Sequence, residues 1–478
     1  MIALSAVVAM ITLLYMVATS PVRGLGRFVA PDTTAAVMLA MIFGVRPLFT
    51  DRFEIRTMYG LIPDTNALDT AMTVGVVSLS FFGFGAFIAA VRPTRAAIFS
   101  KQSAPIERRE VRLTAGGVLG ISVFAIALYV AAIIVLAGPS SLTALSGGRS
   151  EDATLGGVPE FVLVIPMAGS VAATIFFISR RNRQIHVFEL LLILAAIAIS
   201  LTALSQLGNR RFLIPGLLIP LVAALIRSPV RLKAWHLVLG VVGFLFLAIV
   251  PMVRSAGARM PGENLLTASL RYFGDEGFRG VLTPVFASYD TEMLDYIAVF
   301  AGQPNPEYGL GRGTLLEFLA RPLPGDVFGT AFSDQVLTSI WGGGCGQPYC
   351  PVGSLAGVLY FDGGLPAVAV GSFLFGIAVR FIANRWAFNS MLSTVSASSI
   401  AVVSGFALVA ARTNTVHAIW WCVYVLLLMA GIYLISSRRM DGQASLAKAP
   451  GERLEVRENL RDGDRSLAGD RRADGALS

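Results

Sequence analysis

Arginine is the residue type whose placement in this chain most clearly predicts chemistry. Arg210 and Arg211 stand in a very short turn, residues 208–211, between two apolar segments. Charged side chains beside hydrocarbon are costly unless they have a partner, so a standing anionic partner is expected at this turn. The planar guanidinium binds phosphate oxygens through paired, charge-assisted hydrogen bonds. The turn therefore predicts a site for an anionic lipid phosphate.

Other arginines fall in the hydrophilic segment 253–353 and at the end of a later apolar segment. Each of them either extends the anionic site or forms an ordinary salt bridge with a nearby acid such as Asp275 or Glu292. For a single loop arginine the salt bridge is the simpler interpretation, whereas the adjacent pair in the turn favours anion binding. The candidates for extending the site are Arg271, Arg279, Arg321 and Arg412.

His417 is the histidine placed best for catalysis, because it lies at the start of the last apolar segment, close in sequence to Arg412. An imidazole titrates near neutral pH and can act as general base on a hydroxyl group. A polar anchor at the membrane interface is the alternative interpretation. His186 and His236 fall at helix ends that are expected to face the cytoplasm and are interpreted as structural or interfacial.

The apolar run that begins at Leu355 is interrupted before it continues as a span. Tyr360 and Phe361 are followed by an acid, two glycines, a leucine and a proline, from Asp362 to Pro366. Irregular backbone at membrane depth is tolerated only where it lines a cavity or packs inside protein. The interruption therefore predicts either a functional cavity or a helix packed closely through its glycines.

Familiar cofactor and metal motifs are missing from the sequence. It has no nucleotide-binding loop, no histidine spacing typical of a metal site and no serine-hydrolase elbow, so neither a cofactor nor a metal is expected. The chain has 3 cysteines. Cys422 lies in an apolar run and is expected to pack there, while Cys345 and Cys350 form either a small disulfide loop or two free thiols.

Composition places these residues in a membrane protein. The chain has 478 residues, of which 55% are hydrophobic and 14% charged, whereas a soluble domain has about 25% charged residues. Its mean hydropathy is +0.69. The formal net charge of +8 comes almost entirely from arginines between apolar stretches, so it predicts membrane topology and not a nucleic-acid partner.

The apolar segments predict an all-α polytopic membrane protein with about eleven transmembrane helices, since a span needs roughly 20 apolar residues. The candidate spans are 2–19, 33–49, 71–91, 113–137, 161–179, 187–205, 212–226, 235–252, 354–381, 392–411 and 416–435. Whether the second and seventh cross fully is open, because they contain prolines and the seventh is short. The predicted organisation is helices 1–8 in residues 1–252, one large extracytoplasmic loop with short helices in 253–353, helices 9–11 in 354–436 and a disordered cytoplasmic tail in 437–478.

Arginine and lysine also predict the orientation. They are concentrated in every second connection, beginning with the one after the first span and ending after the last. By the positive-inside rule these connections face the cytoplasm. The C-terminus is therefore expected inside, and segment 253–353 outside.

Several local patterns together resemble the oligosaccharide repeat-unit polymerases, the Wzy-type O-antigen polymerases. They are the turn 208–211, the Glu-Tyr-Gly at 307–309 before an apolar helix at 315–319, Arg321-Pro322 leading to Asp326, and the stretch 360–366 at the start of a span. The resemblance covers roughly residues 204–385 and the general topology. The chain departs from the family pattern in having Arg-Pro for Pro-Arg, a glycine-cysteine insertion at 342–350 and Asp362-Gly363, which leaves the substrate open more than the reaction class.

The resemblance implies glycosyl transfer on the outer face of the bacterial cytoplasmic membrane. The donor would be a growing glycan on undecaprenyl pyrophosphate and the acceptor a single lipid-linked repeat unit, with a chain-length regulator as a further partner beside the membrane lipids. The residues implied in substrate binding are Arg210, Arg211, Arg271, Arg279, Arg321, Arg412, Tyr360 and Asp362. The candidates for accepting the hydroxyl proton are His417, Asp290 and Asp334.

Three other functions are alternatives to polymerisation. A ligase that moves finished glycan to another acceptor would use the same site. A membrane-embedded polyprenyl-phosphate sugar transferase is disfavoured, because the first outer loop has no adjacent pair of acids. A polysaccharide or lipid transporter predicts ionisable residues in mid-span and repeated halves, whereas this sequence has nearly charge-free spans, a long outer loop and no evident internal repeat.

Overall fold

The structure is a computed structural model of the full chain. It describes residues 1–48, 65–91, 109–111, 113–139, 158–181, 183–206, 210–230, 233, 240, 267, 270–275, 277, 293–322, 339–340, 353–387 and 393–439. The chain separates into two units, residues 1–95 with 113–433 and residues 96–112 with 434–478. The first unit contains the candidate site.

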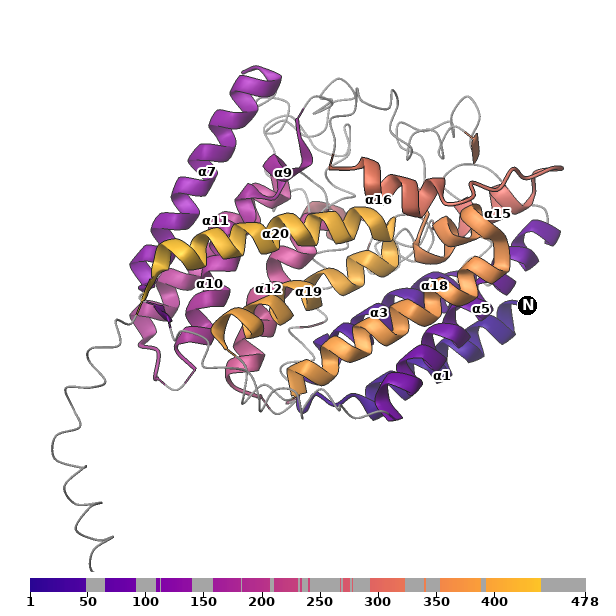
Figure 1. Ribbon diagram of the computed structural model, residues 1–478, viewed down its shortest axis with the longest axis horizontal. Helices are drawn as coiled ribbons and strands as arrows, with labels where there is room; N and C mark the ends of the chain where they lie inside the picture. The colour runs from indigo at the N-terminus through magenta and orange to yellow at the C-terminus, as the bar shows by residue number, and fades with distance from the viewer. Residues whose placement is uncertain are drawn as a thin grey trace, which may run out of the picture. The chain divides into compact units, whose positions relative to one another are not determined.

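Long apolar helices dominate the first unit (Figure 1). Among the described residues, 8 helices are long and apolar enough to cross a membrane. Five belong to the first half of the chain: α1 (Ile2–Thr19), α5 (Thr65–Val91), α7 (Ala115–Ala137), the run from α9 (Glu160–Leu163) through η3 (Ile165–Met167) to α10 (Ala168–Ser179), and α11 (Val187–Gln206). The other three are α18 (Leu355–Ala387), α19 (Thr394–Arg412) and α20 (Thr415–Ser436). The prediction of a helical, multi-pass membrane protein is thereby confirmed.

The count of eleven spans stays a prediction. The second predicted span corresponds to α3 (Pro31–Ala40), which follows the short α2 (Gly26–Val29) and continues through the π-helix η1 (Met41–Val45). The seventh corresponds to α12 (Arg210–Arg227), which contains Pro215 and Pro220. The eighth, 235–252, falls almost wholly outside the described residues, as does much of the predicted loop 253–353.

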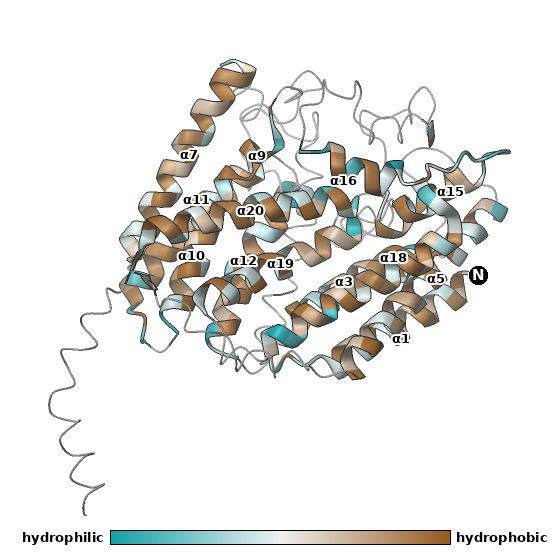
Figure 2. Ribbon diagram, in the orientation of Figure 1, coloured by the Kyte–Doolittle hydropathy of each residue, from teal (hydrophilic) through white to brown (hydrophobic). Residues whose placement is uncertain are grey.

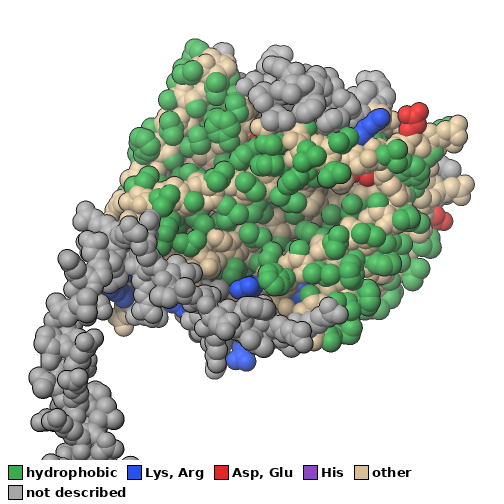
Figure 3. Space-filling view, in the orientation of Figure 1, with side chains coloured by type: hydrophobic (Ala, Val, Ile, Leu, Met, Phe, Trp, Pro, Cys, Tyr) green, Lys and Arg blue, Asp and Glu red, His purple; other side chains and the backbone are tan. Residues whose placement is uncertain are grey.

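The outward faces of these helices carry apolar side chains. On α1, for example, Leu4, Val7, Ile11 and Leu14 are each at least half exposed. Figure 2 shows hydrophobic residues along most of the helix surfaces, and Figure 3 shows hydrophobic side chains covering much of the visible face. An apolar surface of this kind is what a hydrocarbon environment requires.

Helices α5 and α18 run side by side and approach each other closely through glycine (Figure 1). A β-carbon on Gly376 would stand 2.2 Å from the carbonyl oxygen of Phe82, and one on Gly85 would stand 2.1 Å from that of Phe373. Ser78 and Ser372 join the same two helices by a hydroxyl–hydroxyl hydrogen bond of 2.9 Å. Small residues and buried hydroxyls of this kind are typical of helix contacts inside membranes.

The predicted interruption at residues 360–366 is a kink in α18. Gly363 and Gly364 leave helical geometry, and Gly364 has a φ of 64°, a conformation that other residues rarely adopt. Pro366 follows inside the helix. The kink lies against the segment that carries η5 (Arg312–Leu316) and α16 (Glu317–Ala320).

Two ion pairs are buried in the first unit. Arg46, which follows η1, lies 2.6 Å from Asp295 on α15 (Met293–Ala301), and the two side chains are 1% and 7% exposed. Arg380 on α18 lies 2.7 Å from Asp32 at the start of α3 and also donates to the carbonyl of Thr19. Each pair joins helices that are distant in sequence.

The second unit contains one short antiparallel pair of strands. Strand β1 (Arg109–Val111) pairs with β2 (Ser437–Arg439), with Arg109 opposite Arg439 and Val111 opposite Ser437. Of the tail 437–478, for which disorder is predicted, residues 437–439 form β2, and residues 440–478 lie outside the described residues.

Candidate functional site

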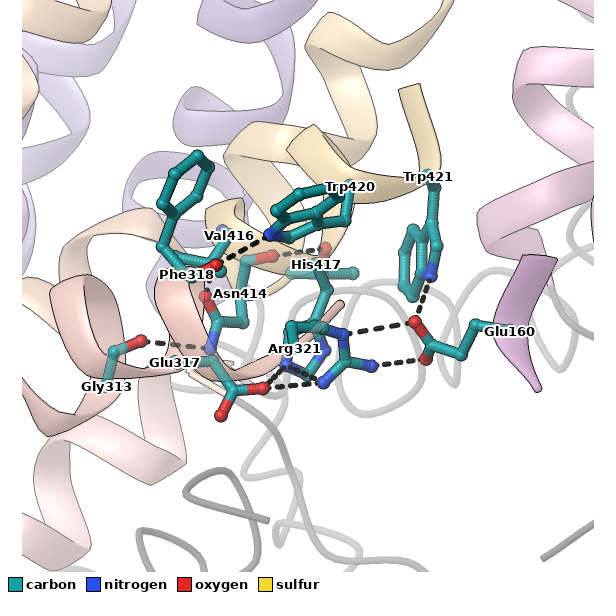
Figure 4. Close-up of polar contacts among 11 residues, drawn as sticks. Glu160, Gly313, Glu317, Phe318, Arg321, Asn414, Val416, His417, Trp420 and Trp421 are labelled. Carbon is teal, nitrogen blue, oxygen red and sulfur yellow. Dashed lines mark hydrogen bonds and ion pairs between the residues drawn. The ribbon is translucent and has the colours of Figure 1, made fainter. Parts of the chain in front are cut away.

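The guanidinium of Arg321 is the centre of a polar cluster that joins Glu160, the segment 313–321 and the start of α20 (Figure 4). Its Nε donates to Glu160 Oε2 over 3.1 Å, and its Nη2 donates to the other oxygen of the same carboxylate. Its Nη1 donates to Glu317 Oε1 over 2.6 Å. The planar fork is thus shared between two carboxylates, one of them bound by two parallel bonds.

His417 completes the cluster from the first turn of α20. Its Nε2 lies 2.6 Å from Nη1 of Arg321 and 2.9 Å from Oε1 of Glu317. The imidazole is 15% exposed and Glu317 is 2% exposed. The ring nitrogen therefore lies between a cation and a carboxylate at the edge of the protein interior.

Arg211 joins the cluster from the first turn of α12. Its guanidinium carbon lies 4.7 Å from the centre of the Trp421 ring, which suits a cation–π contact. Trp421 in turn donates from its indole nitrogen to Glu160 Oε2 over 2.9 Å. The positive charge of Arg211 is close enough to act on the Glu160 carboxylate. The predicted arginine turn and the predicted histidine are thereby brought to one place.

The start of α20 is tied to the loop that precedes Glu317. Asn414 accepts from the backbone nitrogen of Val416 over 3.0 Å, as expected of a side chain at a helix N-terminus. The same side chain donates to the carbonyl oxygen of Gly313 over 3.3 Å. This hydrogen bond fixes the position of His417 relative to the segment that carries Glu317.

Asp362 anchors that segment from the kink of α18. Its carboxylate accepts from the backbone nitrogen of Gly313 over 2.8 Å and from the hydroxyl of Thr314 over 2.5 Å. Gly309 donates to the carbonyl of Phe361 over 2.8 Å, and a β-carbon at Gly309 would lie 2.1 Å from the Phe361 ring. The glycine-containing turn and the start of α18, both singled out from the sequence, are therefore in direct contact.

Burial and charge act in opposite directions on Glu317. Burial by itself would raise its pKa, but the hydrogen bonds and charges of His417 and Arg321 hold the pKa below its ordinary value. The carboxylate is consequently ionised at neutral pH. It supplies a negative charge directly beside the imidazole and the guanidinium.

Tyr360 lies in an aromatic cluster next to the anchored segment. Its ring centre is 5.8 Å from that of Phe300 and 6.3 Å from that of Tyr308, both in near-perpendicular arrangement. Phe300 also contacts Phe361 at 5.4 Å. In the structure Tyr360 and Asp362 support the loop, and the prediction that they bind substrate stays a prediction.

The remaining predicted residues lie elsewhere or outside the described residues. Arg271 forms an ion pair of 3.6 Å with Asp275 on the segment 270–275, as the salt-bridge interpretation expected. Arg412 is half-buried in the last turn of α19, two residues before Asn414. The side chain of Arg210 is not described, nor are Arg279, Asp290, Asp334, Cys345 and Cys350. Cys422 on α20 has a free thiol and is half-buried.

The sequence analysis did not identify the two carboxylates of the cluster, Glu160 and Glu317, as candidate site residues. Glu317 precedes Arg321 by four residues in a helical turn, a spacing that places opposite charges side by side and could have identified it. Glu160 begins α9 after Pro159, at the edge of an apolar segment, and nothing local connects it to Arg321. Only the packing of distant helices reveals that pair.

The arrangement suits two kinds of chemistry. Arginine forks bind and stabilise anionic oxygens, and a histidine flanked by a carboxylate can accept a proton and hold the resulting charge. Among the described residues, no group of three or more histidine, cysteine, aspartate or glutamate side chains could hold a metal ion. Comparison with known proteins returns no matching family model, no matching curated protein and no matching solved structure.

Proposed function

We propose that the protein polymerises oligosaccharide repeat units carried on a polyprenyl diphosphate. The observation that carries this proposal is the convergence of Arg211, Arg321 and His417, from three distant segments, on one cluster. Diphosphate-binding side chains and a proton acceptor are the two needs of this reaction. The resemblance of the sequence to the repeat-unit polymerases supports the same reaction class.

The chemistry balances with the groups present. A hydroxyl oxygen of the acceptor attacks the anomeric carbon of the donor sugar, and a new carbon–oxygen bond forms there. The bond from that carbon to the diphosphate breaks, and the electron pair leaves with the polyprenyl diphosphate. The hydroxyl proton passes to Nε2 of His417, whose positive charge the Glu317 carboxylate then stabilises.

Arg321 and Arg211 would stabilise the negative charge that develops on the leaving diphosphate. Fixed donors aimed at a developing charge are among the largest contributions to enzymatic rate. Arg210 and Arg412 lie within a few residues of the cluster in sequence and are proposed to assist.

The proposed setting is the bacterial cytoplasmic membrane, with the cluster on its outer face and the C-terminus in the cytoplasm. The arginine distribution among the connections supports this orientation. The lipid-linked glycan would then reach the site after it has crossed the membrane. A chain-length regulator is a proposed partner.

The test compares surface glycan by gel ladder in strains carrying Arg211→Ala, Arg321→Ala or His417→Ala, each at wild-type protein level. Loss of long chains with accumulation of single lipid-linked units is expected. Arg385→Ala is the matched control, because Arg385 is exposed and lies against Phe381 on α18, away from the cluster in sequence. Wild-type ladders in all three variants would overturn the proposed site.

The same gels separate polymerase from ligase. Loss of a polymerase leaves single units, whereas loss of a ligase leaves long chains that remain on the lipid carrier. If the His417→Ala strain accumulates long lipid-linked chains, the site therefore carries out glycan ligation and not polymerisation.

A further inference from the structure

The Nε2 atom of His417 has two neighbours with opposite requirements. Nη1 of Arg321, at 2.6 Å, can only donate a hydrogen bond, and Oε1 of Glu317, at 2.9 Å, can only accept one. When Nε2 has a free lone pair, the guanidinium donates to it. When Nε2 carries a proton, that proton points to the carboxylate. The arrangement gives the ring nitrogen a partner in both protonation states.

Arg321 therefore covers the lone pair that a general base needs. Of the five N–H groups of a guanidinium, four are directed at Glu160, Glu317 and His417 (Figure 4). Two of the four hold the Glu160 carboxylate. Movement of the whole guanidinium away from His417 would also break its two bonds to Glu160, and we expect a second anion to replace them.

We propose that Glu160 acts as an internal substitute for the substrate diphosphate, and that its displacement from Arg321 uncovers His417 as the base. This inference rests on the proposed function and adds to it a link between diphosphate binding and base activation. Glu160 and Glu317 are positioning residues in this scheme, because they act through Arg321 and His417.

Exposure and anchoring favour Glu160 as the partner that is displaced. Its side chain is 26% exposed, compared with 2% for Glu317. The bond from the Trp421 indole holds Glu160 in place when the guanidinium leaves. A diphosphate offers more charge and more oxygens to an arginine fork than a single carboxylate does.

The charges around the imidazole explain the consequence of that displacement. Glu317 and Arg321 on the α16 segment, Glu160 on α9 and Arg211 on α12 are the described charged groups of the cluster. With Arg321 bound to diphosphate, the lone pair of His417 loses its donor and faces the Glu317 carboxylate. Proton transfer from an acceptor hydroxyl to Nε2 is then favoured, and it is disfavoured in the absence of donor substrate.

The test measures how fast diethyl pyrocarbonate modifies His417 in the full-length protein in detergent at pH 8, by mass spectrometry, with inorganic pyrophosphate as the probe. His186 is exposed and serves as an internal reference in the same digest. Pyrophosphate is expected to increase the labelling of His417 relative to His186 about tenfold, as loss of one charge-assisted hydrogen bond from the reacting nitrogen implies. Sulfate at equal ionic strength is expected to have little effect. Unchanged or slower labelling of His417 with pyrophosphate would overturn the proposal.

Two pairs of variants keep the outcome decisive. Arg321→Gln is expected to label quickly without pyrophosphate and to gain nothing from it. Arg312→Gln, at an exposed arginine in η5, is expected to behave as wild type. Glu160→Gln is expected to respond at lower pyrophosphate concentration, and the exposed Glu307→Gln at the wild-type concentration. Slow labelling in Arg321→Gln contradicts the covering role of the guanidinium.

The labelling test does not depend on glycosyl transfer. One outcome is that pyrophosphate speeds the labelling of His417 while the variants keep wild-type glycan ladders. That result would support the link between diphosphate binding and base activation and would overturn the proposed function. Loss of long chains in the variants, with no effect of pyrophosphate on labelling, would support the proposed function and overturn the link.

Discussion

The carboxylate of Asp362, at the kink of α18, accepts a hydrogen bond of 2.8 Å from the backbone nitrogen of Gly313, 49 residues earlier in the chain. This bond fixes the segment that continues into Glu317 and Arg321. Asn414 holds the same glycine from the other side and leads into His417. One glycine thus connects the kinked helix to both halves of the candidate site.

Removal of that carboxylate is expected to loosen the site. Asp362→Ala leaves the Gly313 nitrogen and the Thr314 hydroxyl without their acceptor, at a cost of about 1–3 kcal/mol in the free energy of unfolding. The variant should show a lower thermal midpoint in detergent and shorter glycan chains. Asp275→Ala, at a carboxylate that is 65% exposed, is the control. Equal midpoints for the two variants would contradict the anchoring role.

The buried ion pair between Arg46 and Asp295 gives a second prediction. Arg46→Met leaves an uncompensated carboxylate in the interior, and a loss of about 3–5 kcal/mol is expected. The double variant Arg46→Met with Asp295→Leu should recover most of that loss, since no buried charge remains. Thermal unfolding of the two proteins measures both effects. A double variant as unstable as the single one would show that packing, and not charge, sets the cost.

The close contact of α5 and α18 predicts intolerance of one added methyl group. Gly376→Ala places a β-carbon 2.2 Å from a backbone oxygen of Phe82, so the helices must separate and the protein should lose stability or yield. Gly431→Ala on α20 is the control, because nothing lies within 4 Å of its β-carbon position. It should be neutral or stabilising, by up to about 1 kcal/mol for glycine to alanine in a helix. Detergent stability assays compare the pair.

Glu317 predicts a dependence of stability on pH. Its folded pKa is lowered from the ordinary value of 4.5, so its contribution is fully present above pH 4.5 and is lost as the pH falls through the folded pKa. Glu317→Gln should therefore be less stable than wild type at pH 7, and the difference should shrink below pH 4.5. Thermal midpoints of the two proteins measured from pH 7 to pH 3.5 test the sign. A difference that grows on acidification contradicts it.

Helices such as α1, α5 and α11 could be predicted because a span requires a long run of apolar residues and little else. Which helices pack together could not be predicted, since each span is apolar on nearly every face and hydropathy carries no pairing information. The contact of Gly85 and Gly376 with opposing backbones is a property of the packed pair. No single segment encodes it.

The candidate site divides in the same way. Arg211 and His417 could be predicted as candidates from their places at the ends of apolar segments, and Arg321 from the Arg-Pro pair that resembles the repeat-unit polymerases. Their assembly around Glu160 depends on how α9, α12 and α20 pack together, and local sequence does not predict that packing. Arg271 shows the limit of the reasoning, because its neighbour Asp275 is an equally good partner four residues away.

Direct assay of the purified protein tests the central claim most directly. The full chain in lipid nanodiscs is given a defined repeat unit on a polyprenyl diphosphate, and the glycan products are sized by mass spectrometry. Wild type is predicted to form products of two and more repeat units with release of free polyprenyl diphosphate, while Arg321→Gln and His417→Ala form few or none and Arg312→Gln matches wild type. Products of one unit only from the wild-type protein, or chain extension by Arg321→Gln at the wild-type rate, would contradict polymerisation at this site.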